Sequence, residues 1–114
     1  EAEWGRAAAR LLLNDGAAFD AVICQNDVLA RGCIEELERS GCRVPQDVAV
    51  IGHDNSPDYV SYAHPLLTSI DDNNEMLGRQ AALCLLDAIA GHPHHGVERV
   101  PVKLIQREST LPLD

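Results

Sequence analysis

The stretch AVICQND at residues 21–27 and the stretch VAVIGHDN at residues 48–55 decide the fold. Each begins with an apolar run of strand length and ends in polar side chains, and a helix-patterned segment lies between them. This order predicts a β-α-β unit with hydrogen-bonding groups after both strands. In open parallel sheets, ligands bind in the crevice outside the carboxyl ends of the strands. The sequence therefore predicts where a ligand binds before it indicates which ligand.

Hydrophobic periodicity predicts further elements on both sides of this unit. We expect a helix at 4–13, a strand at 20–24, a helix at 27–40, a strand at 47–51, a loop at 55–66, a short strand at 67–70, a helix at 72–90 and a strand at 98–105. This alternation predicts an α/β fold with a parallel sheet. The continuous apolar run at 47–51 predicts helices on both faces of the sheet. Because the strands are few, we expect the chain to be the C-terminal part of a longer protein.

The composition excludes some partners. The net charge is −9 at pH 7, so the chain lacks the basic patch that binds nucleic acid. No apolar run is long enough to span a membrane, and we expect no membrane partner. The four cysteines have no C-x-x-C spacing, and Cys24, Cys33 and Cys84 fall in strand or helix patterns. They are predicted to be small core residues, which favours a reducing cytoplasm.

Three side chains are candidates for ligand binding. Asn26 offers amide donors and an acceptor, and Asp54 offers a carboxylate that can accept from two neighbouring hydroxyls. This pair suits a sugar, a polyol or a ribose. The local alternatives are a helix cap for Asn26 and ordinary turn chemistry for Asp54. Trp4 either stacks on a ligand ring or lies half-buried at the edge of the core.

Other motifs are weaker candidates for chemistry. His53, Asp54 and Ser56 are the residue types of a hydrolytic triad, but residues this close after a strand rarely reach its geometry. The histidine run His92–His95 has no cysteine or carboxylate set at metal-binding spacing, so we interpret it as a solvated loop. The acidic residues of 35–38 are interpreted as a solvated helix face. We predict no catalytic residue, no metal ligand and no cofactor.

Short motifs occur in a fixed order along the chain: Gln25-Asn26-Asp27, Arg43-Val44-Pro45, Gly52 with Asp54-Asn55, Pro65-Leu66-Leu67-Thr68, Leu77-Gly78 and Arg107-Glu108-Ser109-Thr110. Together they resemble the lac/gal repressor (LacI/GalR) family. The resemblance implies a type I periplasmic-binding-protein fold, of which this chain holds an incomplete, Rossmann-like lobe. It also implies a bacterial transcription regulator whose two-lobed domain senses a small effector and controls a helix-turn-helix head that is not in this chain.

The resemblance implies roles at individual positions. Asn26 matches a ligand-facing asparagine, Asp54 matches an acidic residue that receives effector hydroxyls, and Trp4 matches an aromatic residue that packs on the ligand. His53 stands where the family has Phe or Tyr. Arg31 stands where the family has an apolar residue facing the second subunit, so we expect it either to pair across the two-fold axis or to weaken the dimer.

The resemblance also divides the chain between lobes. Residues 1–71 are expected in the C-terminal lobe, 72–103 form a helix and strand of the N-terminal lobe, and 104–114 return to the C-terminal lobe. Alone, the helix at 72–90 would expose its apolar stripe. We therefore expect swapping or dimerisation if the isolated chain is stable.

We expect the effector-sensing part of a cytoplasmic repressor that binds a sugar or related polyhydroxylated metabolite. A homodimer and operator DNA, bound through the head, are its expected partners. The alternative on the same fold is a periplasmic sugar receptor of a transporter. A small enzyme using His53 and Asp54 is a third hypothesis, and it lacks a nucleophile or metal motif.

Overall fold

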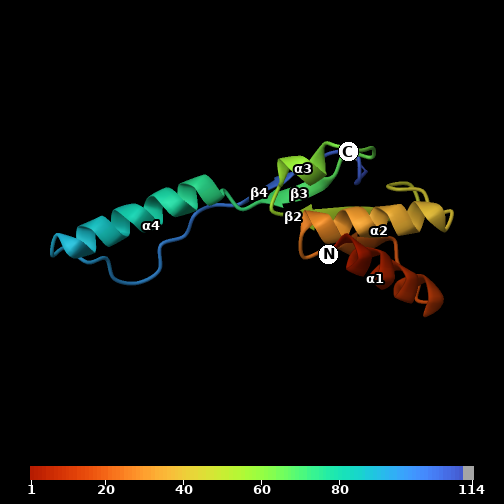
Figure 1. The fold of residues 1–114 in the computed structure, drawn as a ribbon, viewed down its shortest axis with the longest axis horizontal. Coiled ribbons are helices and arrows are strands. Elements are labelled where there is room, and N and C mark those ends of the chain that lie inside the picture. Colours follow the sequence, from red (N-terminus) through yellow and green to blue (C-terminus); the bar gives the residue numbers. More distant parts are fainter. Residues whose placement is uncertain (112–114) are drawn as a thin grey trace.

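A computed structural model describes residues 1–111 of the chain. Helices and strands alternate along it (Figure 1), as the periodicity predicts. The elements are α1 Ala2–Asn14, β1 Ala21–Ile23, α2 Asp27–Arg39, β2 Ala49–His53, α3 Pro57–Val60, β3 Thr68–Asp71, α4 Asn74–Ile89 and β4 Lys103–Ile105.

Two of the predicted boundaries are wrong. Strand β2 continues through Gly52 and His53, because both residues pair with β3. The strand expected at 98–105 is limited to its last three residues, because the antiparallel ladder with β3 ends where Asp71 pairs with Lys103. The short helix α3 also lies within the segment expected to be a loop.

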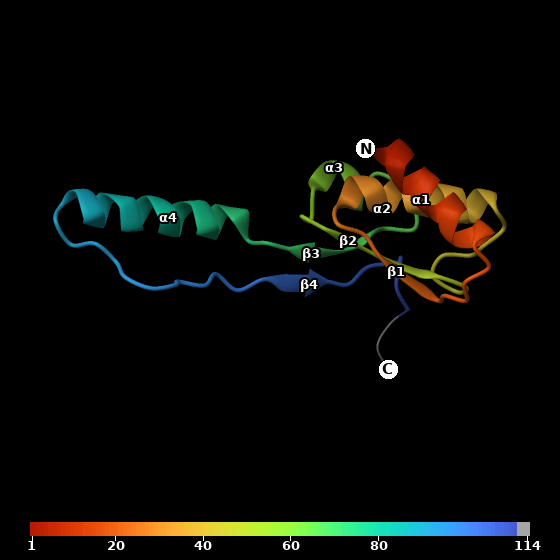
Figure 2. The same cartoon turned by 90° about the horizontal axis from the view of Figure 1, so that it is seen from below.

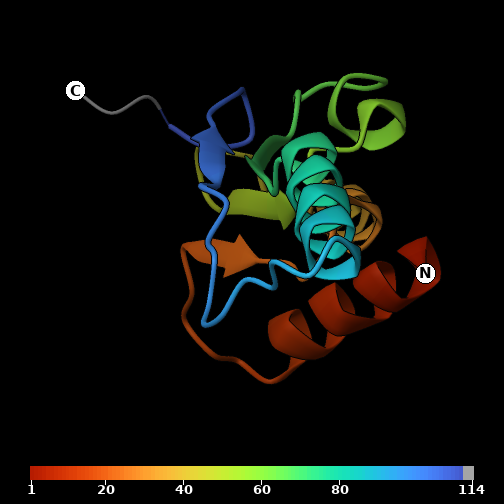
Figure 3. The ribbon, with the colours of Figure 1, turned by 90° about the vertical axis from the view of Figure 1, so that its left-hand side faces the viewer.

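The sheet has the order β1-β2-β3-β4, with the first three strands parallel and β4 antiparallel to β3. The predicted α/β class is therefore confirmed. Burial alternates along β2, however, with Val50 and Gly52 buried and their neighbours half-buried. Helices α1, α2 and α3 lie on one side of the sheet (Figure 3), so among residues 1–111 the expectation of helices on both faces is wrong.

Helices α1 and α2 cross at two glycines. A Cβ on Gly5 would lie 2.1 Å from the carbonyl oxygen of Leu29, and a Cβ on Gly32 would lie 1.9 Å from that of Ala2. Only residues without side chains let two backbones approach this closely. This close crossing places the first turn of α1 near the start of α2, where the ligand-binding residues are expected.

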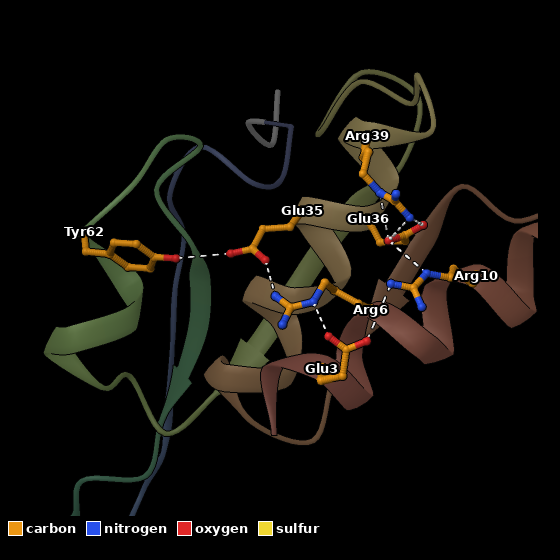
Figure 4. Close-up of polar contacts among 7 residues, drawn as sticks. All are labelled: Glu3, Arg6, Arg10, Glu35, Glu36, Arg39 and Tyr62. Atoms are coloured by element: carbon orange, nitrogen blue, oxygen red, sulfur yellow. Dashed lines mark hydrogen bonds and ion pairs between the residues drawn. The ribbon is translucent and has the colours of Figure 1, made fainter.

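An ion-pair network joins the same two helices (Figure 4). Glu36 is buried, and it accepts from Arg39 at 2.6 Å and pairs with Arg10 at 3.2 Å. The pKa of Glu36 is held below its ordinary value, first by the hydrogen bond from Arg39. A solvated acidic face was therefore the wrong interpretation for Glu36. The network also includes Glu3, Arg6, Glu35 and Tyr62.

Arg31 is also inside the molecule, with 3% of its surface exposed. Its guanidinium donates to the carbonyl oxygens of Pro65 at 2.7 Å and Val60 at 3.1 Å, and also to that of Tyr59. Burial lowers its pKa from the ordinary arginine value. The expectation that Arg31 faces a second subunit is wrong here, because its donors hold the loop around α3 onto α2.

The molecule has two parts that differ in shape. Residues 1–73 and 103–111, which we name the body, form the sheet and its helices, and residues 74–102, the arm, project from it (Figure 2). The principal extents are 60 × 29 × 24 Å. Helix α4 in the arm has no buried residue. Within residues 1–111, none of the helices is both long and apolar enough to cross a bilayer.

Candidate functional site

The candidate site lies where β1, β2 and β3 end, because these strands are parallel and in register. The segments after them carry Asn26, Asp54 and Asp72. Such an edge is where ligands bind in open α/β sheets. The structure thus brings the ends of three strands together, one more than the sequence predicted.

Asn26 caps helix α2. Its backbone is extended, and its side-chain oxygen accepts from the amide of Leu29 at 2.8 Å. Its amide nitrogen lies 3.4 Å from a carboxylate oxygen of Glu1, at the start of α1. The cap interpretation is therefore confirmed. With one lone pair of the oxygen used by the cap and one N–H directed at Glu1, the side chain keeps one acceptor site and one donor for a ligand.

Asp54 follows β2 with a φ of 100°, and its backbone amide donates to the carbonyl oxygen of Ile70. Its side chain is 49% exposed. His53 lies between two carboxylates, with Nδ1 3.1 Å from Asp54 and Nε2 3.2 Å from Asp72. Both ring nitrogens of His53 contact carboxylates, so the imidazole is not arranged as a general base for Ser56. The carboxylates of Asp54 and Asp72 form an acidic rim, and the Asp54 oxygen that does not contact His53 can accept from hydroxyl donors.

Trp4 is 75% exposed on the first turns of α1. Half-burial at the core edge is therefore wrong for this side chain. Glu1, three residues earlier, contacts Asn26, so the indole belongs to the helix end nearest the site. Its exposed face is free to stack, but no packing fixes its orientation.

The residue that organises the site is Asp27, which the sequence pattern did not single out as a ligand or scaffold residue. Asp27 is 1% exposed, and its carboxylate accepts from the hydroxyl of Ser69 at 2.6 Å and from the amide of Ser56 at 2.7 Å. The Ser69 hydroxyl in turn accepts from the amide of Asn55 at 3.0 Å. A Cβ on Gly52 would lie 2.2 Å from the Asp27 carboxylate. Asp27 therefore fixes the loop that carries Asp54.

A second support comes from the end of the chain. Arg107 donates to the side-chain oxygen of Asn55 at 2.7 Å and to the carbonyl oxygen of Leu67 at 2.8 Å. The side-chain amide nitrogen of Asn55 donates to the carboxylate of Asp71 at 3.1 Å. Asn55, at a φ of 50°, is thus held on both sides. The only sequence signal for this role was the Asp54-Asn55 pair followed much later by Arg107, which does not predict a contact.

Comparisons with known proteins identify the kind of domain that the chain resembles. The model of the periplasmic binding protein-like domain family matches residues 1–110. The HTH-type transcriptional regulator CelR of Thermobifida fusca is 39% identical over 106 residues, covering 92% of this chain and 31% of CelR. The chain spans about a third of the length of the curated relatives it matches.

Solved structures give the same result. A dimeric Lac repressor with an 11-residue C-terminal deletion superimposes with a TM-score of 0.90 at 32% identity, covering 100% of this chain and 42% of the repressor. The complex of the transcriptional regulator CelR with cellobiose superimposes with a TM-score of 0.83 at 38% identity, covering 95% of this chain and 33% of CelR.

Proposed function

The chain belongs to the LacI/GalR family of periplasmic binding protein-like domains, and from this membership we propose that it is the effector-sensing part of a bacterial transcriptional regulator. The observation that carries the proposal is the open carboxylate of Asp54, held at the carboxyl end of β2 by a buried scaffold. The relatives reported above are transcription regulators, one of them in complex with cellobiose, which favours this function over a transporter receptor or an enzyme.

The effector is a sugar or a related polyhydroxylated metabolite. Asp54 accepts from its hydroxyls, the amide of Asn26 donates to its oxygens, and Trp4 stacks on its apolar face. In support, Asn26 offers an amide donor and the Asp54 carboxylate offers only acceptors, so the pair suits ligand hydroxyls, which both donate and accept.

Residues 1–71 and the return at 104–114 belong to one lobe, of which 112–114 lie outside the described residues, and the segment 72–103 belongs to the second lobe. Strands β3 and β4 run side by side between body and arm (Figure 2), which supports a crossover there. The effector favours the closed arrangement and so changes the affinity of the DNA-binding head for its operator. We place the protein in the cytoplasm as a homodimer.

The test is an Asp54→Asn variant of the intact regulator. Asparagine tolerates the positive φ, so the variant removes the charge with little strain. We expect effector binding to weaken by roughly 10- to 100-fold, as for lost charged hydrogen bonds, while operator binding persists. Asp20→Asn, at the opposite edge of the sheet, is the matched control. Effector response at wild-type concentrations in Asp54→Asn would refute this role.

A further inference from the structure

A cluster of metal-ligating side chains lies in the arm, away from the effector site. The segment after α4 turns at Gly91 and Gly96, both at positive φ, and brings His94 and Glu98 back onto the helix. His94 Nδ1 lies 2.8 Å from Glu98, and the thiol of Cys84 lies 3.6 Å from the other oxygen of Glu98. Thiol, imidazole and carboxylate thus meet from two segments.

The spacing of these atoms fits one small cation. Cys84, His94 and Glu98 each offer a ligand atom, and these atoms all lie within 4.8 Å of one another. Donors in a tetrahedral site at about 2.0–2.3 Å from the metal lie about 3–4 Å apart. Side-chain movements of less than about 1 Å close the remaining gap, and His94 and Glu98 are exposed while Cys84 is half-buried.

A fourth side chain orients the imidazole. His94 Nε2 lies 2.6 Å from a carboxylate oxygen of Asp87, one turn after Cys84 on α4. Metal-binding histidines usually donate their second N–H to a carboxylate, which fixes the tautomer and the ring orientation. Asp87 therefore leaves Nδ1 as the atom that faces Cys84 and Glu98.

We propose that Cys84, His94 and Glu98 bind a divalent zinc-type cation, with Asp87 as a positioning residue. A thiolate, an imidazole and one carboxylate are donors that zinc accepts, and water completes the fourth position. On binding, the Cys84 thiol and the Nδ1–H of His94 release their protons to solvent, and the sulfur and Nδ1 bond to the metal. Without metal, Asp87 and Glu98 hold the imidazole by hydrogen bonds. The bound ion would fasten the returning segment to α4.

Cobalt substitution in the intact protein tests the proposal, since a cobalt–thiolate bond has its own charge-transfer absorption. We expect this band in the wild type and in Cys42→Ser, which changes a cysteine outside the cluster. Cys84→Ser should lose the band and bind zinc at least about 10-fold more weakly in competition with a chelator. Absence of the band in the wild type, or its persistence in Cys84→Ser, would overturn the proposal.

Two further variants separate ligand from positioning roles. Asp87→Asn should retain the thiolate band while zinc affinity falls about 10- to 100-fold, as for other outer carboxylates. His94→Gln should weaken zinc binding more than His95→Gln, its neighbour in the same loop. Equal affinities in His94→Gln and His95→Gln, with both proteins folded by circular dichroism, would contradict the assigned ligand set.

Discussion

Helices α2 in the body and α4 in the arm both carry apolar side chains at helical spacing, but their surroundings are opposite. Helix α2 buries a stripe against the sheet and α1, whereas α4 leaves every residue at least partly exposed. The exposed apolar side chains of α4 include Leu77, Leu85 and Ile89. An apolar stripe therefore predicts a buried helix face only together with the element that covers it. In α4 that element is not among residues 1–111.

This contrast leads to an expectation for the isolated chain. The exposed stripe of α4 favours association through the arm, because contiguous apolar surface on a soluble protein is usually covered. Analytical ultracentrifugation should show dimers or larger species, and Leu85→Glu should shift them toward monomer. A monomeric wild-type chain at high concentration would contradict this expectation.

The largest expected difference between body and arm is in leucine truncation. Leu37→Ala in the body should lower the free energy of unfolding of the monomeric chain by about 2–5 kcal/mol, because Leu37 is fully buried. Leu85→Ala in the arm should change it by less than about 0.5 kcal/mol, because Leu85 is 62% exposed. Urea unfolding measures both. Equal losses of stability in Leu37→Ala and Leu85→Ala would contradict the expected difference between body and arm.

Two glycine substitutions should change the free energy of unfolding in opposite directions. Gly32→Ala should destabilise the body by about 1–3 kcal/mol, because the new Cβ meets the carbonyl of Ala2. Gly78→Ala should stabilise α4 by about 0.5–1 kcal/mol, because a Cβ there has no heavy atom within 4 Å and alanine favours helix. Thermal unfolding followed by circular dichroism distinguishes them. Destabilisation by Gly78→Ala would show that the helix face at Gly78 is covered.

Weakening the buried scaffold of the candidate site should have a smaller effect. Asp27→Asn replaces a carboxylate oxygen that accepts from the Ser56 amide or the Ser69 hydroxyl with a donor, and should cost about 1–2 kcal/mol of stability. Effector affinity should fall as well, because the loop carrying Asp54 loosens. Asp58→Asn on exposed α3 is the matched control. Unchanged urea midpoint and effector affinity would contradict the scaffold role.

The smallest effect concerns pH. Arg43 holds the pKa of Asp47 at about 2, below its ordinary 3.8, through side-chain and backbone hydrogen bonds. A depressed carboxyl pKa stabilises the fold above the ordinary value, and this contribution is lost as pH falls from about 4 toward about 2. Asp47→Asn should flatten the stability profile slightly in that window, since the pair is exposed. If the free energy of unfolding, measured with urea, fell equally between about pH 4 and about pH 2 in both proteins, the pair would contribute nothing to stability.

Local signals predicted much of this structure. Apolar periodicity located α1, α2 and α4, and the residue types after β1 and β2 indicated where the candidate site lies. The cap at Asn26 was also predictable, because capping depends on neighbours three residues apart. The sheet boundaries were less predictable, because the antiparallel strand β4 begins where its partner β3 ends, and pairing is not a local property.

Contacts between distant residues were not predictable in the same way. Asp27 bonds to Ser69, 42 positions later, and Arg31 bonds to carbonyls about 30 positions away. Cys84 and the histidine run gave no metal spacing in sequence, because the loop between them folds back at two glycines. A pattern of single residues does not record which segments the fold brings together.

The sequence by itself determined the alternation of helices and strands and the polar sheet edge, since both follow from short-range periodicity and from the residue types at strand ends. The tertiary structure decided which charges are buried and which leucines are exposed. Glu36 and Arg31 lie inside while Leu85 lies outside, because burial is set by the segments packed against a residue and not by its own polarity.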